Sequence, residues 1–553
     1  MSANPPMPQE VPVLIVGAGP VGLALANELG YRGIAYLLVD EGNGEVVFPA
    51  GEGIFSRTME HLRRWGYSSE VRETSLFPAD QPRNTIFATS FRGRELARFT
   101  GLSNRQEARS NPHSPEGGMF CPKMAFDPAL RRGAERAGVG VLRYRTRLAS
   151  FSQNEDCVHA EVVDLEEGTR YAVRARYLAA ADGAHSAVRR TLNVNYVGSF
   201  AEGHNFAIHF QCEPLAREIH RLYGAPITQL HMLNEANRPY LVAVNGTDQW
   251  RLSMYIDPSD KPDPADTLRR IFGSELPMQV LRAQPWKGNR VVAERYRVDR
   301  VFLLGDAAHL RWPKGGFGAN TGIGDAVDLG WKLWASLQGW GGDGLLDSYE
   351  LERRPIAVRN VNEAANNRVF DEMIVATDLL DAAGVDGDAA RQAIAHDLYA
   401  YRLREFRTAG IQLGYRYRNS PICIADGSLE PPDDHMLYSP STWPGARAPH
   451  VWLSDARSTL DLFGPDFVLI RLDPAIDAAN WVQAAKARGV PFRVVDLDGA
   501  AAAVRERYER SLVLVRPDGH VAWRADDNPA DAAAILGKVT GHAGRSGFEV
   551  LNR

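Results

Sequence analysis

A chain of 553 residues exceeds what a single hydrophobic core supports, and three or four domains are expected. Hydrophobic residues make up 44% and charged residues 24%, which is ordinary for a globular protein. The formal net charge of −5 and the absence of a Lys/Arg-rich run argue against nucleic acid or an anionic membrane as a partner.

The cysteines and the N-terminal segment indicate a cytoplasmic protein. The four cysteines are widely spaced and form no CxxC pair, which is typical of a reducing compartment and argues against a disulfide framework or a metal site. The segment MSANPPMPQE has no basic residue ahead of the apolar stretch, unlike a signal peptide. No apolar run approaches the roughly 18 residues of a membrane span.

The first predicted elements form a βαβ unit. Residues 11–16 predict a buried strand, a helix runs to about Arg32, and residues 35–39 predict a second strand. Its turn carries GxGxxG and its end carries two acids; these residues are Gly17, Gly19, Pro20, Gly22, Asp40 and Glu41. The glycines admit a pyrophosphate at the helix N-terminus, and the acid suits ribose hydroxyls. The unit predicts dinucleotide binding, with NAD and FAD both open.

Two further strand ends carry an acid. In LAAADGAHSAVRR, Asp182 follows an apolar strand, although an Asp-Gly pair alone is more typical of a simple turn. In VFLLGDAAHLRWPKGGFGANTGIGDA, Asp306 ends a short strand, glycines crowd the next turn, and a helix is predicted from Thr321 to about Leu337. Ligands of open α/β sheets bind beyond the carboxyl ends of strands, so both acids are candidates for one cofactor site.

The remaining segments predict three other units. Short alternating runs in 86–117 and 200–295 indicate an antiparallel sheet, and 346–430 is largely helical. Residues 440–553 follow the order β-α-β-α-β-β-α, which is thioredoxin-like. Because this unit lacks CxxC, we expect it to be structural rather than redox-active.

Three motifs together resemble those of the FAD-dependent aromatic hydroxylases, the single-component flavoprotein monooxygenases. These are GAGPVG, DGAHSAVR and GDAAHLRWPKGGFGANTGIGDAVDLGWKL. The C-terminal unit is similar to that of the phenol hydroxylase branch. The resemblance implies an α/β fold in which a Rossmann-like FAD-binding domain (1–85, 118–199 and 296–345) holds an inserted antiparallel substrate domain (86–117 and 200–295). A helical segment and the thioredoxin-like domain would follow.

The resemblance also implies roles for individual residues around non-covalent FAD. Asp306 would bind the ribitol chain, and Pro313 would line the ring face where oxygen is activated. The turn through Gly318 and Asn320 would approach the pyrimidine end of the flavin, whose reduced form is anionic and is stabilised by a helix N-terminus. The other residues assigned to the cofactor are Asp182, Arg189, Gly305, Gly316 and Ala319, with Arg189 also a candidate contact for NAD(P)H.

The segment before Arg57 holds one departure from the family and one candidate catalytic acid. Members often carry an arginine seven residues before the arginine of RTxE, where this chain has Ala50. Glu52 occupies the position of a carboxylate that phenol hydroxylase-like members place near the substrate hydroxyl, where it would assist ionisation of the phenol. An ordinary loop glutamate is the alternative.

The expected activity is NAD(P)H- and O2-dependent hydroxylation of a phenolic or related aromatic ring through a flavin C4a-hydroperoxide. The alternatives are a halogenase or reductase on the same fold, and a flavin-binding protein without turnover. The expected partners are the small aromatic substrate, NAD(P)H and O2, with a homodimer left open.

Overall fold

The computed structural model describes residues 6–453, 456–497 and 502–542. The first sheet has the order β16-β17-β10-β1-β2-β7, and β17, β10, β1, β2 and β7 run parallel. Their bounds are β1 Glu10–Val16, β2 Tyr36–Val39, β7 Gly140–Arg143, β10 Arg170–Ala180 and β17 Val301–Leu303; β16 is Arg297–Val298. A hairpin of β8 (Thr146–Gln153) and β9 (Val158–Asp164) extends β10. The Rossmann-like prediction is confirmed.

Three helices pack around this sheet because its strands are apolar and buried. They are α1 (Pro20–Tyr31), α5 (Lys123–Ala137) and α9 (Phe317–Leu337). The predicted start of α9 at Thr321 is wrong by four residues. Gly316 has φ +74° and acts as the N-cap, and the residues after it are already helical. The segment Gly318–Asn320 is therefore the first turn of a helix rather than a loop.

The second sheet has the order β18-β15-β11-β14-β13-β12-β4-β5 and is antiparallel except for the pair β12 and β4. Its strands are β4 Thr85–Ala88, β5 Glu95–Phe99, β11 Tyr196–Gln211, β12 Gln229–Met232, β13 Tyr240–Ala243, β14 Gln249–Ile256, β15 Gln279–Ala293 and β18 His309–Leu310. The chain joins this sheet through β18, which begins three residues after Asp306. The segment after Asp306 therefore connects the two sheets.

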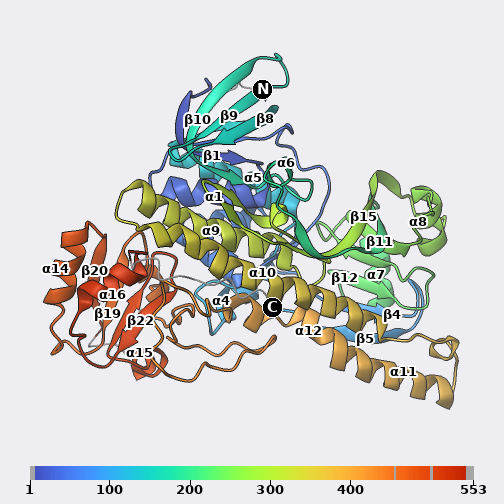
Figure 1. Cartoon of the computed structure of the whole chain (residues 1–553). Helices are drawn as coiled ribbons and strands as arrows, with labels where there is room; N and C mark the ends of the chain where they lie inside the picture. The colour runs from blue at the N-terminus through green and yellow to red at the C-terminus, as the bar shows by residue number, and fades with distance from the viewer. Residues whose placement is uncertain (1–5, 454–455, 498–501, 543–553) are drawn as a thin grey trace.

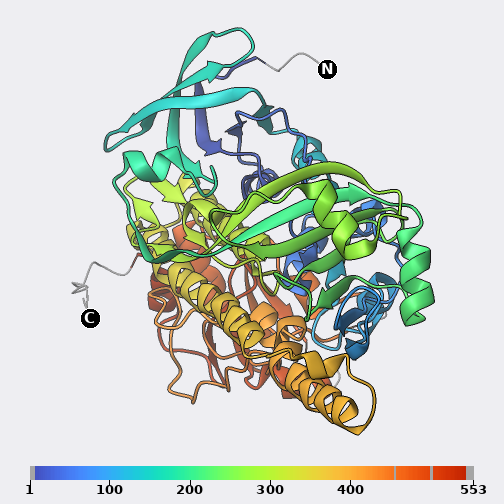
Figure 2. The same ribbon diagram turned by 90° about the vertical axis from the view of Figure 1, so that its right-hand side faces the viewer.

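A long helix, α10 (Asp343–Glu372), packs against α9 and β15. In Figure 2 the long strands β11 and β15 curve across the molecule, and α10 runs below them. The predicted helical segment continues through α11 (Val385–Asp397), a π-helical turn (Leu398–Arg402), α12 (Leu403–Phe406) and α13 (Ala409–Leu413). Among the described residues, no helix is long and apolar enough to cross a membrane.

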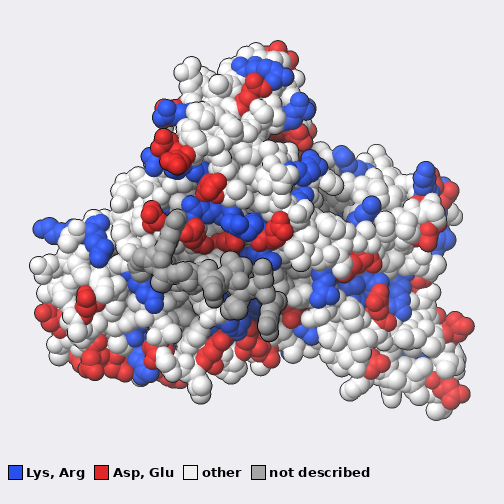
Figure 3. All heavy atoms as spheres, in the orientation of Figure 1, with Lys and Arg blue, Asp and Glu red and all other residues white. Residues whose placement is uncertain are grey.

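The C-terminal unit has the sheet order β20-β19-β21-β22. Its elements are β19 Phe467–Arg471, α14 Ala479–Arg488, β20 Phe492–Asp496, α15 Ala502–Tyr508, β21 Leu512–Val515, β22 Val521–Ala525 and α16 Ala532–Val539. This order confirms the predicted α/β unit. The unit lies at one side of α9 and α10 in Figure 1. On the face shown in Figure 3, acidic and basic side chains are interspersed, and no broad area has one sign.

The hairpin between β21 and β22 inserts a charged side chain into the body of the protein. Arg516 is fully buried and donates to Glu352 on α10 (2.6 and 3.0 Å) and to Asp328 on α9 (3.2 Å). Lys332 also donates to both carboxylates, at 2.6 and 2.7 Å. Burial raises the pKa of Asp328, whereas Arg516 and Lys332 outweigh burial at Glu352 and lower its pKa.

Replacing Arg516 with methionine should destabilise the whole protein, because Glu352 and Asp328 would keep only one cation among the described residues, Lys332. Removing one partner of a buried ion pair costs about 3–5 kcal/mol. Arg510→Met is the matched control in the same unit, since Arg510 pairs with Asp526 on the surface at 3.1 Å and should contribute at most about 1 kcal/mol. Urea unfolding of both variants measures the difference. Equal midpoints would show that the buried cluster does not hold the C-terminal unit to the body.

Candidate active site

Three acids gather along one edge of the Rossmann-like sheet. Asp40 follows β2, Asp182 follows β10 and Asp306 lies just beyond β17. These strands are parallel and adjacent through β1, so their carboxyl ends meet at the same edge. The glycine turn after β1 lies between Asp40 and Asp182. The structure thus brings the three sequence motifs into one row.

The glycines of the first turn differ in what surrounds them. Gly17 has φ +102°, and a Cβ there would lie 2.3 Å from the carbonyl oxygen of Ala181. A Cβ at Gly22 would lie 1.9 Å from the carbonyl oxygen of Gly17. A Cβ at Gly19, by contrast, would meet no described atom within 4 Å. Gly19 is the N-cap of α1, with Pro20 next, so free helix N–H groups face open space. That space suits a pyrophosphate.

Asp40 holds this turn in place. Its two carboxylate oxygens accept hydrogen bonds from the backbone N–H groups of Ala18 and Gly42, both at 2.7 Å. A carboxylate has about four acceptor positions, so capacity remains for the predicted ribose hydroxyls. Glu41, the second predicted acid, has an exposed side chain.

A cavity of about 820 Å³ opens beside Gly19 and Asp40. Two basic residues that the sequence analysis did not single out line it, Lys123 and Arg131 on α5. Lys123 pairs with Asp127, and Arg131 lies over the ring of Tyr144 at 4.4 Å. The i, i+4, i+8 spacing of these three α5 residues places them on one helix face, which is the signal that could have identified them.

Asp182 has a buried carboxylate oxygen, Oδ1, without a hydrogen-bond partner among the described residues. Its Oδ2 accepts from the N–H of Val188 at 3.2 Å, and burial raises its pKa. A buried polar atom of this kind can accept a hydrogen bond from a water molecule or a ligand.

Arg189 connects the second motif to the third. Its guanidinium donates to the carbonyl oxygen of Val194 at 2.9 Å and lies 3.9 Å from the ring centre of Tyr196. The Tyr196 hydroxyl in turn donates to the carbonyl oxygen of Asp306 at 2.7 Å. Arg189 thus has a positioning role in the structure, which the sequence did not predict.

The glycine-rich turn gives α9 an open N-terminus. Its first turn contains no acid and its N-cap makes no side-chain hydrogen bond. Gly305 has φ +55° and packs against Val21, and the Asp306 side chain is 54% exposed. Pro313 is exposed, and Ala319 is partly exposed in the first turn.

Asn320 ties α9 to the segment that carries Glu52. Its amide donates to the carbonyl oxygens of Gly53 (2.9 Å) and Gly316 (2.7 Å). Its Oδ1 accepts from the N–H of Phe55 (2.9 Å) and the hydroxyl of Thr58 (2.7 Å). Three of these bonds hold residues 53–58 against the helix N-terminus, a packing role that the motif alone did not reveal.

Glu52 is buried and forms an ion pair with Arg251 of β14 at 2.6 Å. Arg251 also donates to the carbonyl oxygen of Pro49 at 2.6 Å, beside the exposed Ala50. The Glu52 carboxylate therefore lies between the cofactor-binding part and the antiparallel sheet. Arg251 is far from Glu52 in sequence, and no local pattern indicated this pair.

Lys314, next to Pro313, enters a buried polar cluster below the antiparallel sheet. Its ammonium lies 3.2 Å from a carboxylate oxygen of Asp371, which also accepts from Tyr255 (2.9 Å) and pairs with Arg402. Lys314 and Arg402 outweigh burial and hold the pKa of Asp371 far below its usual range. This cluster was also missed, because its members come from separate segments.

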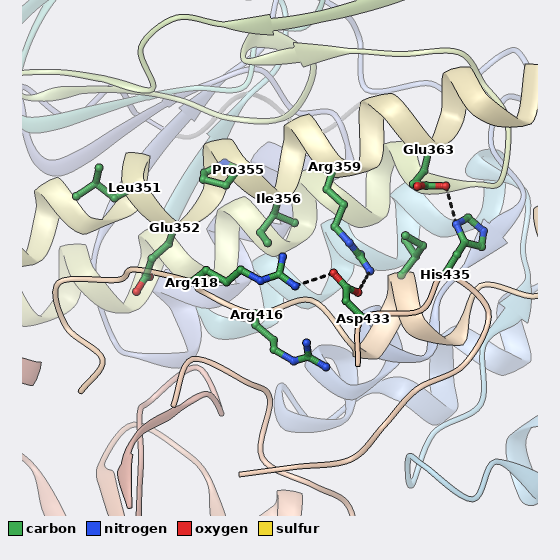
Figure 4. Close-up of a pocket in the computed structure, with 11 residues that line it drawn as sticks. Leu351, Glu352, Pro355, Ile356, Arg359, Glu363, Arg416, Arg418, Asp433 and His435 are labelled. Carbon is green, nitrogen blue, oxygen red and sulfur yellow. Dashed lines mark hydrogen bonds and ion pairs between the residues drawn. The ribbon is translucent and has the colours of Figure 1, made fainter. Parts of the chain in front are cut away.

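A smaller cavity of about 270 Å³ lies on the outer side of α10 (Figure 4). Its charges compensate one another: Asp433 pairs with Arg359 (2.7 Å) and Arg418 (2.8 Å), and Glu363 pairs with His435 (2.8 Å). These pairs fasten the segment after α13 to α10. The cavity shares none of the residues of the strand-end site.

The row of strand-end acids, the open glycine turn and the unpartnered Asp182 oxygen fit an extended dinucleotide such as FAD and define a dinucleotide-binding flavoprotein. The FAD binding domain family matches residues 10–364, and the C-terminal domain of aromatic-ring hydroxylases matches residues 441–543. The chain belongs to the FAD-binding aromatic-ring hydroxylases, the class A flavin monooxygenases, with FAD as cofactor.

Several similar proteins align with almost the whole length of the chain. Tetracenomycin B2 monooxygenase-dioxygenase from Streptomyces olivaceus is 35% identical over 96% of this chain and 98% of its own. A 4-methyl-5-nitrocatechol 5-monooxygenase from Burkholderia sp is 32% identical over 95% and 96%. The structure of the rebeccamycin biosynthetic enzyme RebC with reduced flavin has a TM-score of 0.89 at 37% identity and covers 97% and 100%. The chain is an FAD-dependent monooxygenase of aromatic or polyketide substrates.

Gly19→Ala and Gly22→Ala should fail in different ways. A methyl group at Gly19 meets no protein atom, so the apoprotein should keep its stability but bind FAD at least tenfold more weakly, about 1.4 kcal/mol. A methyl group at Gly22 collides with the Gly17 carbonyl and should destabilise the apoprotein by about 1–3 kcal/mol. Apoprotein unfolding and fluorescence titration with FAD separate the two effects. Unchanged FAD affinity in Gly19→Ala would contradict the pyrophosphate assignment.

Proposed function

We propose that this enzyme uses NAD(P)H and O2 to hydroxylate a phenolic or closely related aromatic ring. Family membership favours a monooxygenase over a halogenase, a reductase or a flavin-binding protein without turnover. The phenolic substrate class is supported by Glu52, a buried carboxylate between the cofactor-binding part and the antiparallel sheet. Bound FAD would supply hydride acceptance from NAD(P)H and the activation of O2.

The chain's own residues would bind and orient this cofactor. The Oδ1 atom of Asp182 would accept a hydrogen bond from the cofactor. Asp306 would face the ribitol chain. We place the pyrimidine edge of the flavin at the first turn of α9, whose open N-terminus favours negative charge. Asn320 would act indirectly, by holding the Glu52 segment beside that turn.

Glu52 would accept the proton of the substrate hydroxyl. A phenol with a pKa of about 10 is about three units from ionisation at pH 7, or roughly 4 kcal/mol, and an ionised ring is far more reactive toward electrophilic oxygen. Arg251 keeps the Glu52 carboxylate in one orientation.

The decisive test of the function is aromatic-dependent turnover. A panel of phenols is added to the FAD-loaded enzyme with NADH or NADPH, and the product mass is measured under ¹⁸O2. A phenolic substrate should accelerate NAD(P)H oxidation and give a product that carries one ¹⁸O atom. The phenolic substrate class would be rejected if no phenol incorporated ¹⁸O, even where it accelerated NAD(P)H oxidation, while non-phenolic aromatics did incorporate ¹⁸O.

Glu52→Gln should retain the shape of the side chain and remove the base. Loss of a general base typically lowers a rate about 10²–10⁴-fold. The loss should fall on hydroxylation, measured as product per NAD(P)H consumed and as single-turnover product formation. FAD content should not change. Higher pH and more acidic phenols should partly restore the rate, since more substrate is already ionised.

Glu73→Gln is the control, because Glu73 is exposed on α3 (Ser68–Thr74) and does not line the cavity beside Gly19 and Asp40. It should leave hydroxylation unchanged. If Glu52→Gln also hydroxylates at the wild-type rate and yield at pH 7, Glu52 is only a structural partner of Arg251.

A further inference from the structure

The side chain of Arg311 lies across the first turn of α9. A Cβ atom on Gly318 would come within 2.1 Å of a terminal nitrogen of the Arg311 guanidinium. The Arg311 side chain is only 10% exposed although it carries a charge. In this conformation the guanidinium occupies the space that a side chain at position 318 would take.

A chain of buried polar groups fixes the position of Arg311. Its Nη1 lies 3.2 Å from Nδ1 of His309, and because a guanidinium can only donate, Nδ1 is the acceptor. The Nε2 of His309 lies 2.9 Å from Asp325 on α9 and therefore carries the proton. Asp325 also accepts from Arg353 of α10 at 2.8 Å. His309 is thus an oriented side chain that holds Arg311 toward the N-terminus of α9.

The positive charge at this position is only weakly offset: besides Asp306, the carboxylate of Glu405 lies 3.4 Å from the N–H of Gly315, just before the α9 N-cap. The N-terminus of a helix is already positive, and a cation beside it is unfavourable. The first turn of α9 has no acid, and the carboxylate that faces Arg311, that of Asp306, is 3.4 Å away and half exposed. Close ion pairs have N–O distances of about 2.7–2.9 Å. An anion beside Arg311 and the α9 N-terminus would complete the arrangement.

We propose that Arg311 stabilises the reduced, anionic flavin. Reduction transfers a hydride, two electrons and one proton, from the nicotinamide of NAD(P)H to flavin N5 and releases NAD(P)⁺. The added negative charge is spread over N1 and the C2 carbonyl oxygen. The inference rests on the placement of the pyrimidine edge at the first turn of α9. There the Arg311 guanidinium would lie beside the new charge, and the enzyme would bind reduced FAD more tightly than oxidised FAD.

The test measures the two-electron midpoint potential of enzyme-bound FAD without any aromatic substrate. Arg311→Met should lower the preference for reduced over oxidised flavin at least tenfold, which corresponds to a potential about 30 mV more negative. Sulfite, which forms an anionic adduct at flavin N5, should bind at least tenfold more weakly. Arg311→Lys, which keeps the charge, should retain most of both properties. Arg190→Met, an exposed arginine of α6 (Ala187–Thr191), should change neither.

The pH dependence of the midpoint potential is a second measurement. It would not change if Arg311 had only a structural role. The wild type should take up one proton with two electrons, so its potential should change by about 30 mV per pH unit. In Arg311→Met the reduced flavin should take up a second proton at low pH, which doubles the slope to about 60 mV per pH unit. Asp306 and His309 are the other titratable groups in contact with Arg311, and both remain in every variant.

Two results would overturn the proposal. The first is a potential, slope and sulfite affinity in Arg311→Met equal to those of the wild type. The second is an equal loss of affinity for oxidised and reduced FAD, which would show that Arg311 binds another part of the cofactor, such as the pyrophosphate. If Arg311→Met does not retain FAD, Arg311→Gln keeps a hydrogen-bonding side chain without charge and gives the same readouts. Because no aromatic substrate is used, failure of the phenolic assignment would leave this result intact.

Discussion

The buried charges of α9 are the constraint on which the rest of the structure depends. Asp325 and Asp328 lie about one turn apart, fully or almost fully buried, and each needs cations from elsewhere in the chain. Asp325 pairs with Arg353 and also accepts from His309 and from the N–H of Gly305. These bonds fix the third motif relative to the helix. The turn that precedes α9 is therefore held in position by buried ion pairs and hydrogen bonds of the helix that follows it.

The site between the two sheets is held together by polar contacts over long sequence separations. Asn320 fastens the Glu52 segment to α9, and Arg251 reaches the same segment from β14. Lys314 extends the third motif into the cluster below the antiparallel sheet. A shift of either sheet would break these contacts. The Rossmann-like part and the antiparallel sheet are therefore positioned together around the place where the flavin and the substrate ring would meet.

The sequence was sufficient for features that local chemistry determines. Gly17 and Gly22 are required by close backbone approach within one βαβ unit, and the strand ends at Asp182 and Asp306 follow from short apolar runs. The start of α9 was misplaced because a run of glycines is typical of a loop, whereas Gly316 caps a helix here. Arg251, Lys314 and Arg516 were missed because their partners lie far away in the chain. A side chain's partner across such distances depends on the tertiary fold, which no spacing rule encodes.

The insertion of Arg516 beneath α9 has a consequence for the order in which the protein is built. A chain emerges from the ribosome from its N-terminus, and domains generally fold in that order. Here the carboxylates of Asp328 and Glu352 pair with the guanidinium of Arg516, which lies more than 160 residues downstream of Glu352. This buried cluster can therefore be completed only after the hairpin of the C-terminal unit has been synthesised.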